Sequence, residues 1–189
     1  AVMVCLFLWL YASTGWQGDT LWFGAAILLS LAGDVLLMLP PERLFFFGLV
    51  AFLLAHISYI IGFRAELEII NGWSLILLAI IAVNASRILR RIIGAMRARG
   101  ENKLVVPVVV YGIVISFMLF AAMSTLFDPA WKASAALLVS AGAALFCASD
   151  AMLAWNKFVS PVTNGRFLII VLYHLGQIGL IAGVVSQFS

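Results

Sequence analysis

Long apolar runs dominate this sequence and restrict the folds that are open to it. An α-helix needs about 20 apolar residues to cross a hydrocarbon core roughly 30 Å thick. Six runs approach or exceed that length: 21–39, 44–63, 69–86, 104–127, 133–155 and 167–188. A seventh run, 1–13, is too short to cross, and we expect it to be a first helix truncated upstream. The runs predict an all-α integral membrane bundle of seven visible helices, eight in the full chain, forming one transmembrane domain over 1–189.

Composition excludes the other broad classes of protein. The chain is 65% hydrophobic and 10% charged, whereas a soluble domain averages about 45–50% and 25%. Its net charge of +3 is too small and too scattered for a nucleic-acid partner. Cys5 and Cys147 lie in apolar runs without metal-ligand spacing. We therefore expect a membrane protein with no metal and no cofactor, whose oligomeric state the sequence leaves open.

Basic residues predict the orientation of the chain. If the runs alternate across the membrane, nine of the eleven Lys and Arg residues share one side: Arg43, Arg87, Arg90, Arg91, Arg97, Arg99, Lys103, Lys157 and Arg166. Only Arg64 and Lys132 lie on the other. The positive-inside rule places the larger group in the cytoplasm, and in a bacterium the membrane would be the inner or plasma membrane. Residues 87–103 are expected to form one long basic loop that fixes orientation or also contacts anionic headgroups of membrane lipids.

Two aspartates lie inside the apolar runs, whereas the other six acidic residues lie between them. A carboxylate in the bilayer centre costs roughly 2.5–3.5 kcal/mol on insertion scales, so Asp34 and Asp150 are candidate functional residues. Both lie about five residues, or roughly 7 Å, from the cytoplasmic end of their helix. At matched depth they could form a catalytic pair.

Other polar side chains within the runs are candidates for support or substrate binding. They are His56, His174, Asn84, Tyr111, Tyr59, Ser149 and Gln177. Most belong to the cytoplasmic half, and Tyr59 lies deeper. A single buried Asn, Gln, Ser or Tyr more often joins two helices than takes part in catalysis.

A short internal repeat links the two aspartates. Segment 32–37 (AGDVLL) recurs as 148–153 (ASDAML), and a histidine follows each aspartate in the next helix, after 22 residues in the first copy and 24 in the second. The copies are four spans apart and therefore share one orientation. This predicts a parallel repeat of four plus four helices.

These motifs resemble one known membrane-protein family. The segments 33–40 (GDVLLMLP) and 55–59 (AHISY), followed by Ser149-Asp150 and Tyr173-His174, are similar to the YhhN family of lysoplasmalogenase-type membrane proteins. The resemblance covers nearly the whole chain from Leu21 onward. It implies eight transmembrane helices, a lysophospholipid-type substrate, and an active site around Asp34 and Asp150. The implied reaction cleaves the vinyl-ether bond of a lysoplasmalogen into a fatty aldehyde and glycerophosphoethanolamine or glycerophosphocholine.

Vinyl-ether chemistry is compatible with two carboxyl groups. Protonation of the β-carbon gives an oxocarbenium ion that water captures, and glycosidases stabilise a similar transition state with two carboxyls. Two carboxyls held together in a low dielectric do not both ionise easily. One can act as the acid, while the other stabilises the cation and activates water.

Two other functions fit parts of the pattern. A proton-coupled transporter with an Asp/His relay would suit parallel repeats. Gly176, Gly179 and Gly183 could then make a helix flexible, although close helix packing is the simpler explanation. An intramembrane aspartyl protease would share the pair Gly33-Asp34, but its preceding glycine and a Tyr-Asp partner motif are missing.

Overall fold

The computed structural model describes residues 1–39, 43–63 and 71–189 as a bundle of helices. Its α-helices are α1 (Val2–Thr14), α2 (Thr20–Met38), α3 (Arg43–Gly62), α4 (Gly72–Ala98), α5 (Val105–Ser124), α6 (Ala133–Phe158) and α7 (Gly165–Phe188). Two short 3₁₀ helices, η2 (Asn102–Leu104) and η3 (Thr125–Phe127), flank α5. Arg64, one of the two basic residues expected outside, lies beyond the described residues.

Six helices, α2 to α7, are long and apolar enough to span a membrane, as the sequence predicts. Five of them begin and end within a few residues of the expected runs. The remaining described helix, α1, has 13 residues and is shorter than a span. A count of seven spans and the internal repeat remain predictions.

The prediction of a long loop at 87–103 was wrong, because most of that segment is helical. Helix α4 continues to Ala98, so its 27 residues extend about 40 Å, more than the roughly 30 Å hydrocarbon core. Ile92 and Met96 lie one turn apart and are both buried against Val108 and Phe158. This apolar stripe keeps the segment helical, while its arginines occupy the other faces.

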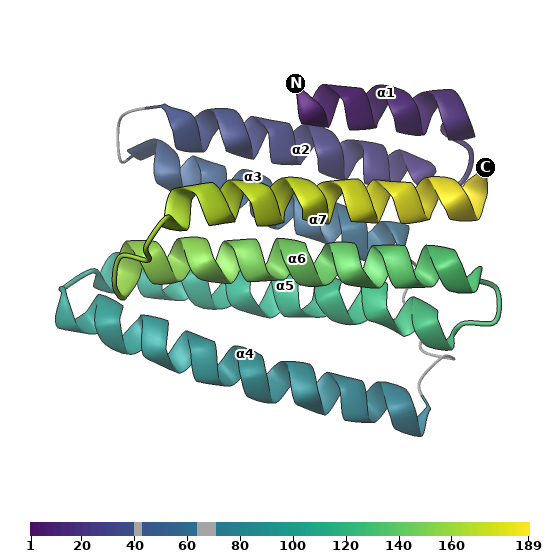
Figure 1. Cartoon of the computed structure of the whole chain (residues 1–189). Coiled ribbons are helices and arrows are strands. Elements are labelled where there is room, and N and C mark those ends of the chain that lie inside the picture. Colours follow the sequence, from purple (N-terminus) through teal and green to yellow (C-terminus); the bar gives the residue numbers. More distant parts are fainter. Residues whose placement is uncertain (40–42, 64–70) are drawn as a thin grey trace.

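The long helices lie side by side along one common axis, and each runs opposite to the one before it in the chain (Figure 1). We call one end of the bundle the basic end: it carries the end of α4, the α4–α5 connection and the end of α6, with Arg97, Arg99, Lys103 and Lys157. The closest packing occurs within two hairpins, α2–α3 and α6–α7. The short α1 lies against α2 and α7, and α4 is the outermost helix beside α5 (Figure 1).

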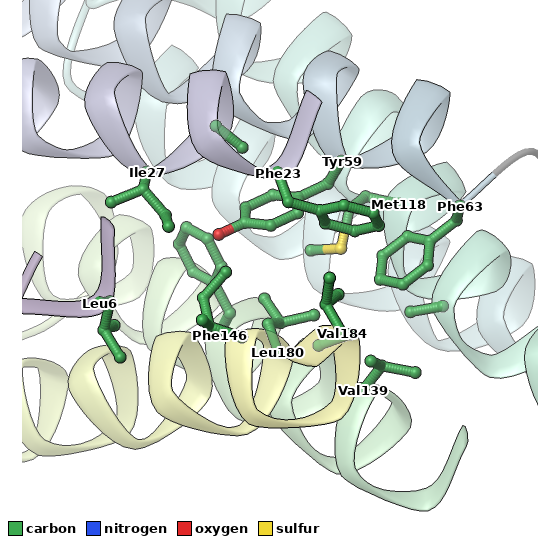
Figure 2. Packing of buried hydrophobic residues seen from close by; sticks show 14 of the residues in the cluster. Leu6, Phe23, Ile27, Tyr59, Phe63, Met118, Val139, Phe146, Leu180 and Val184 are labelled. Carbon is green, nitrogen blue, oxygen red and sulfur yellow. The ribbon is translucent and has the colours of Figure 1, made fainter. Parts of the chain in front are cut away.

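Aromatic side chains fill the centre of the bundle. The ring of Phe23 lies 5.0 Å from Phe63 and 6.0 Å from Tyr59, measured between centroids. Met118 from α5 and Leu180 from α7 close the same cluster and are fully buried (Figure 2). The core therefore joins both hairpins to α5 and fixes the positions of the polar residues that lie between it and the basic end.

Glycines let α6 and α7 approach closely, which confirms the packing interpretation of these residues. A Cβ atom at Gly142 would lie 2.4 Å from the backbone nitrogen of Leu180. One at Gly176 would lie 2.8 Å from the backbone nitrogen of Phe146, and one at Gly179 would lie 2.9 Å from Cα of Gly142. Helix α7 is continuous through these glycines, so they serve backbone contact.

We predict that Gly142→Ala destabilises the bundle, because the new methyl group collides with the backbone of α7. Overpacking of this kind costs about 1–3 kcal/mol, which thermal unfolding in detergent would detect as a lower Tm. Gly94→Ala is the matched control, since a Cβ there meets no atom within 4 Å. An equal Tm for the two variants would contradict the packing role of Gly142.

Candidate active site

Three helices bring Asp150, His56 and Tyr111 together, and we call these residues the Asp150 cluster. His56 Nε2 lies 3.1 Å from Asp150 Oδ2 and 3.0 Å from the Tyr111 hydroxyl oxygen. Tyr111 donates a second hydrogen bond to the same carboxylate oxygen. Helices α3, α5 and α6 thus each contribute one polar side chain to a single point.

The cluster is almost closed to its surroundings. The side chain of Asp150 is 11% exposed and that of His56 is fully buried. The ring of Phe146 lies 4.7 Å from the imidazole, centroid to centroid. Among the described residues, no partner hydrogen-bonds the buried Nδ1 of His56. The imidazole is therefore held through Nε2 alone and by the rings around it.

The second aspartate takes its partner from the other end of the chain. The Tyr173 hydroxyl of α7 donates to Asp34 Oδ2 at 2.9 Å. Gly33 beside it lets α2 pack closely on α3, because a Cβ there would lie 2.6 Å from the ring of Phe52. Phe52 lies on α3, so the Asp34 turn of α2 packs directly on the helix that carries His56.

Aromatic rings connect the two carboxyl groups. Phe146 lies 5.3 Å from Tyr173 and 4.7 Å from His56, and Phe52 lies 5.7 Å from Tyr173. The hydrogen-bond partners of the two aspartates, Tyr173 and His56, therefore meet on the same ring, that of Phe146.

Gln177 and Tyr59 are also brought together, one layer deeper. Tyr59 donates to Gln177 Oε1, and Gln177 Nε2 donates to Ser30 Oγ at 3.0 Å. All three side chains are buried. This chain joins α2, α3 and α7 below the aspartates, which is the helix-joining role common for such residues.

The other predicted site residues lie apart from this region or face a neighbouring helix. Ser149 donates to the Ile169 carbonyl at 3.0 Å and links α6 to α7. His174 is partly exposed, and its Nδ1 lies 2.8 Å from the Ile170 carbonyl of its own helix. Asn84 is exposed on α4 and donates to the Ile80 carbonyl. Its role at the site remains a prediction.

A small apolar cavity reaches the Asp150 cluster from the basic end. Its volume is about 50 Å³, and Asp150 and Tyr111 line it together with Leu37, Phe45 and Phe52. Leu37 lies one turn from Asp34 on α2. A cavity of this size holds a few water molecules or a few carbon atoms. Within the described residues, no three His, Cys, Asp or Glu side chains converge as metal ligands would.

Comparison with known proteins adds a family to this geometry. The YhhN family model matches residues 1–184. The chain belongs to the YhhN family. Lysoplasmalogenase TMEM86B of Homo sapiens is 29% identical over 178 residues, which is 93% of this chain and 69% of that protein. Its Mus musculus counterpart is 28% identical over 95% of this chain and 70% of its own length.

A bacterial relative is similarly distant. The lysoplasmalogenase of Mycobacterium bovis is 30% identical over 142 residues, covering 73% of this YhhN chain and 50% of the relative. No solved structure matches the chain.

Sequence reasoning assigned no role to three residues that shape the site of this YhhN protein. Tyr173, quoted only as part of the family motif, holds Asp34, and Phe52 and Phe146 pack against Tyr173. The place of Tyr173 directly before His174 is the signal that could have assigned it to the site. Phe52 and Phe146 give no such signal, since phenylalanine is common in every apolar run.

We predict that Tyr59→Phe destabilises the bundle by about 1–3 kcal/mol, because it leaves the buried Gln177 carbonyl without a donor. Thermal unfolding in detergent measures the loss as a lower Tm. Tyr11→Phe is the control, since Tyr11 is 52% exposed on α1. Equal stability of the two variants would show that the Tyr59–Gln177 bond contributes nothing.

Proposed function

We propose that this protein is a lysoplasmalogenase-like hydrolase that cleaves the vinyl-ether bond of a single-chain ether phospholipid. The products are a fatty aldehyde and a glycerophosphoethanolamine or glycerophosphocholine. Family membership and the names of its relatives support the reaction class. The observation that carries the proposal is the Asp150 cluster, a carboxylate with two polar partners beside an apolar cavity within a membrane bundle.

The reaction needs a proton donor, a negative charge and a water molecule. The donor protonates the β-carbon of the vinyl ether, and the α-carbon becomes an oxocarbenium ion. Water adds to that carbon and loses a proton, which gives a hemiacetal. The hemiacetal then breaks its C–O bond to the glycerol oxygen. Its hydroxyl loses a proton and becomes the aldehyde carbonyl, while the glycerol oxygen gains a proton and leaves as a hydroxyl group. One water is consumed, and no electrons are exchanged.

Asp150 is suited to the anionic role. Tyr111 and His56 both face Oδ2, and hydrogen bonds to a carboxylate oxygen stabilise negative charge there and fix its position. A fixed charge in a water-poor site stabilises a developing cation more strongly than water does. Asp150 then accepts the proton of the attacking water.

Asp34 takes the role of the acid. It has the hydroxyl of Tyr173 as a single described hydrogen-bond partner, which orients Oδ2 and leaves Oδ1 to carry a proton. In this proposal Asp34 carries the proton and Asp150 the negative charge, since two carboxyl groups in one low-dielectric region do not both ionise easily. General acid–base catalysis of this kind contributes about 10²–10⁴-fold to the rate.

The proposed orientation places the site in the cytoplasmic half of the membrane. Asp34 and Asp150 lie in the parts of α2 and α6 nearer the basic end. Arg97, Arg99, Lys103 and Lys157 at that end would face the cytoplasm by the positive-inside rule. A phosphate-bearing headgroup at the same level would be attracted to these charges.

We predict that Asp34→Asn and Asp150→Asn each lower aldehyde release from a lysoplasmalogen by about 100-fold or more, because each removes one acid–base group. The measurement is aldehyde formation by purified protein, with an ester-linked lysophospholipid as the parallel substrate. Asp128→Asn is the matched control, since Asp128 lies in the α5–α6 connection, where it accepts from the backbone of Ala130.

Three results would contradict the proposal. Wild-type protein that releases no aldehyde rules out vinyl-ether hydrolysis. Fatty acid release from the ester-linked substrate alone points to an esterase. Full activity in both Asn variants rules out the two-aspartate mechanism.

We predict that Tyr111→Phe lowers kcat by about 10- to 100-fold, because the loss of a hydrogen bond to a charged group costs about 1.5–3 kcal/mol. The KM should stay within about twofold, since the hydroxyl acts on Asp150 and not on the bound lipid. Steady-state kinetics measures both constants, with Tyr11→Phe as control. A raised KM at unchanged kcat would instead place the hydroxyl in substrate binding.

A further inference from the structure

A second cavity reaches the Asp150 cluster from the side of α4. Its volume is about 80 Å³, and Asp150, Tyr111 and Cys147 line it opposite Ile88 and Ile92. It adjoins a larger cavity of about 270 Å³ between α4 and α5. Four residues line both: Ala85, Leu89, Gly112 and Ser116. The two cavities therefore adjoin along α4, and we call them together the α4 groove.

The α4 groove is long and narrow. Along α4 its lining extends from Leu78 to Ile92, which corresponds to about 21 Å of helix. One leaflet contributes roughly 15 Å of hydrocarbon thickness, so the groove is long enough to hold one lipid chain. Leu89 and Gly112, which line both cavities, pack closely: a Cβ on the glycine would lie 2.7 Å from the leucine side chain.

The walls of the groove offer hydrocarbon contacts. Its lining between Leu78 and Phe117 is alanine, leucine, isoleucine, phenylalanine and glycine apart from two serines. Ser116 donates to the Gly112 carbonyl at 2.7 Å, and Ser86 donates to the Val83 carbonyl at 2.9 Å. Because both hydroxyls bond within their own helix, they offer no unsatisfied donor to a ligand. The other described polar side chains of the lining, Asp150 and Tyr111, lie at the Asp150 end.

The attachment of α4 explains why this space exists. At the basic end, Arg99 donates to the carbonyls of Lys157 and Val159, and Ile92 and Met96 pack on α5 and α6. Towards its first residue, α4 diverges from the bundle (Figure 1). Helix α4 is thus held at one end and separated from α5 at the other.

We propose that the α4 groove binds the single hydrocarbon chain of the substrate, with the vinyl-ether end at Asp150 and the tail directed along α4 towards Gly72. This assignment rests on the proposed function. It commits to one lipid chain because the groove reaches Asp150, is apolar in its lining, and is long enough for one chain. Phe117, which lines the groove, is an exposed side chain, so a lipid can enter from the bilayer.

The placement of the chain makes the distal groove a length-selective element. A long chain fills the groove between α4 and α5 as far as Leu78, whereas a short chain ends near Leu89. Each buried methylene contributes about 0.8 kcal/mol to binding. Closing the distal part should therefore penalise long chains and spare short ones, which distinguishes substrate binding from general damage to the fold.

We predict that Ala82→Phe, which fills the distal groove, weakens binding of a long-chain lysophospholipid about tenfold or more and changes binding of a short-chain one less than about twofold. The matched control is Val83→Phe on the next position of α4, which is 48% exposed and lines neither cavity. The probes are two ester-linked lysophosphatidylcholines, one with an 18-carbon acyl chain and one with an 8-carbon acyl chain. Their Kd is measured on wild-type protein and both variants in detergent.

Because this assay measures binding, it does not depend on catalysis. If wild-type protein binds both probes but releases no aldehyde, the proposed reaction fails and the groove assignment stands. If Ala82→Phe weakens both chain lengths equally, or Val83→Phe gives the same selective loss, the groove is not the chain site. If chain binding is unchanged but Ala82→Phe alters the oligomeric state in solution, the groove contacts a second copy of the chain and the proposal is overturned.

Discussion

A carboxylate within a membrane bundle must obtain its partners from other helices, and this requirement organises the structure. Asp150 on α6 meets His56 from α3 and Tyr111 from α5. Asp34 on α2 meets Tyr173 from α7. An unpaired polar group in hydrocarbon is costly, so these contacts restrict how the helices can be arranged. The aromatic core below and the α6–α7 contact keep that arrangement rigid.

The two hairpins complete one another. Asp34 belongs to the α2–α3 hairpin but takes its hydrogen-bond donor from α7, and Asp150 belongs to the α6–α7 hairpin but takes His56 from α3. Neither hairpin therefore contains a finished site. The glycines of α6 and α7 matter for this reason, since a wider separation of these helices would move Tyr173 away from Phe146. Packing far from the carboxyl groups thus affects their geometry.

Helix α4 packs differently from the other helices of the bundle. Its end is fixed by Arg99 and by the apolar contacts of Ile92 and Met96, while its beginning stands away from α5. This asymmetry gives the site two kinds of surroundings. The rings of Phe52 and Phe146 close it on one side, and an apolar groove leads away from it on the other.

The sequence by itself determined the class of fold and indicated two aspartates as candidate functional residues. Hydrophobic length alone locates the spans, because the bilayer thickness sets a nearly constant helix length. The cost of burying a carboxylate singles out Asp34 and Asp150 in the same way. The extension of α4 to Ala98 was missed, since arginines among apolar residues obscure a helix that continues beyond the membrane core.

Only the tertiary structure decided which side chains meet. The sequence offered His56, Tyr111, His174 and Asn84 as supporting candidates, and packing brought the first two to Asp150 while leaving Asn84 exposed on α4. The contacts of Tyr173, Phe52 and Phe146 in the site came only from the tertiary structure. The physical reason is that helix rotation and neighbour choice depend on how side chains from all helices fit together. Hydropathy along one helix gives its length but not its facing partner.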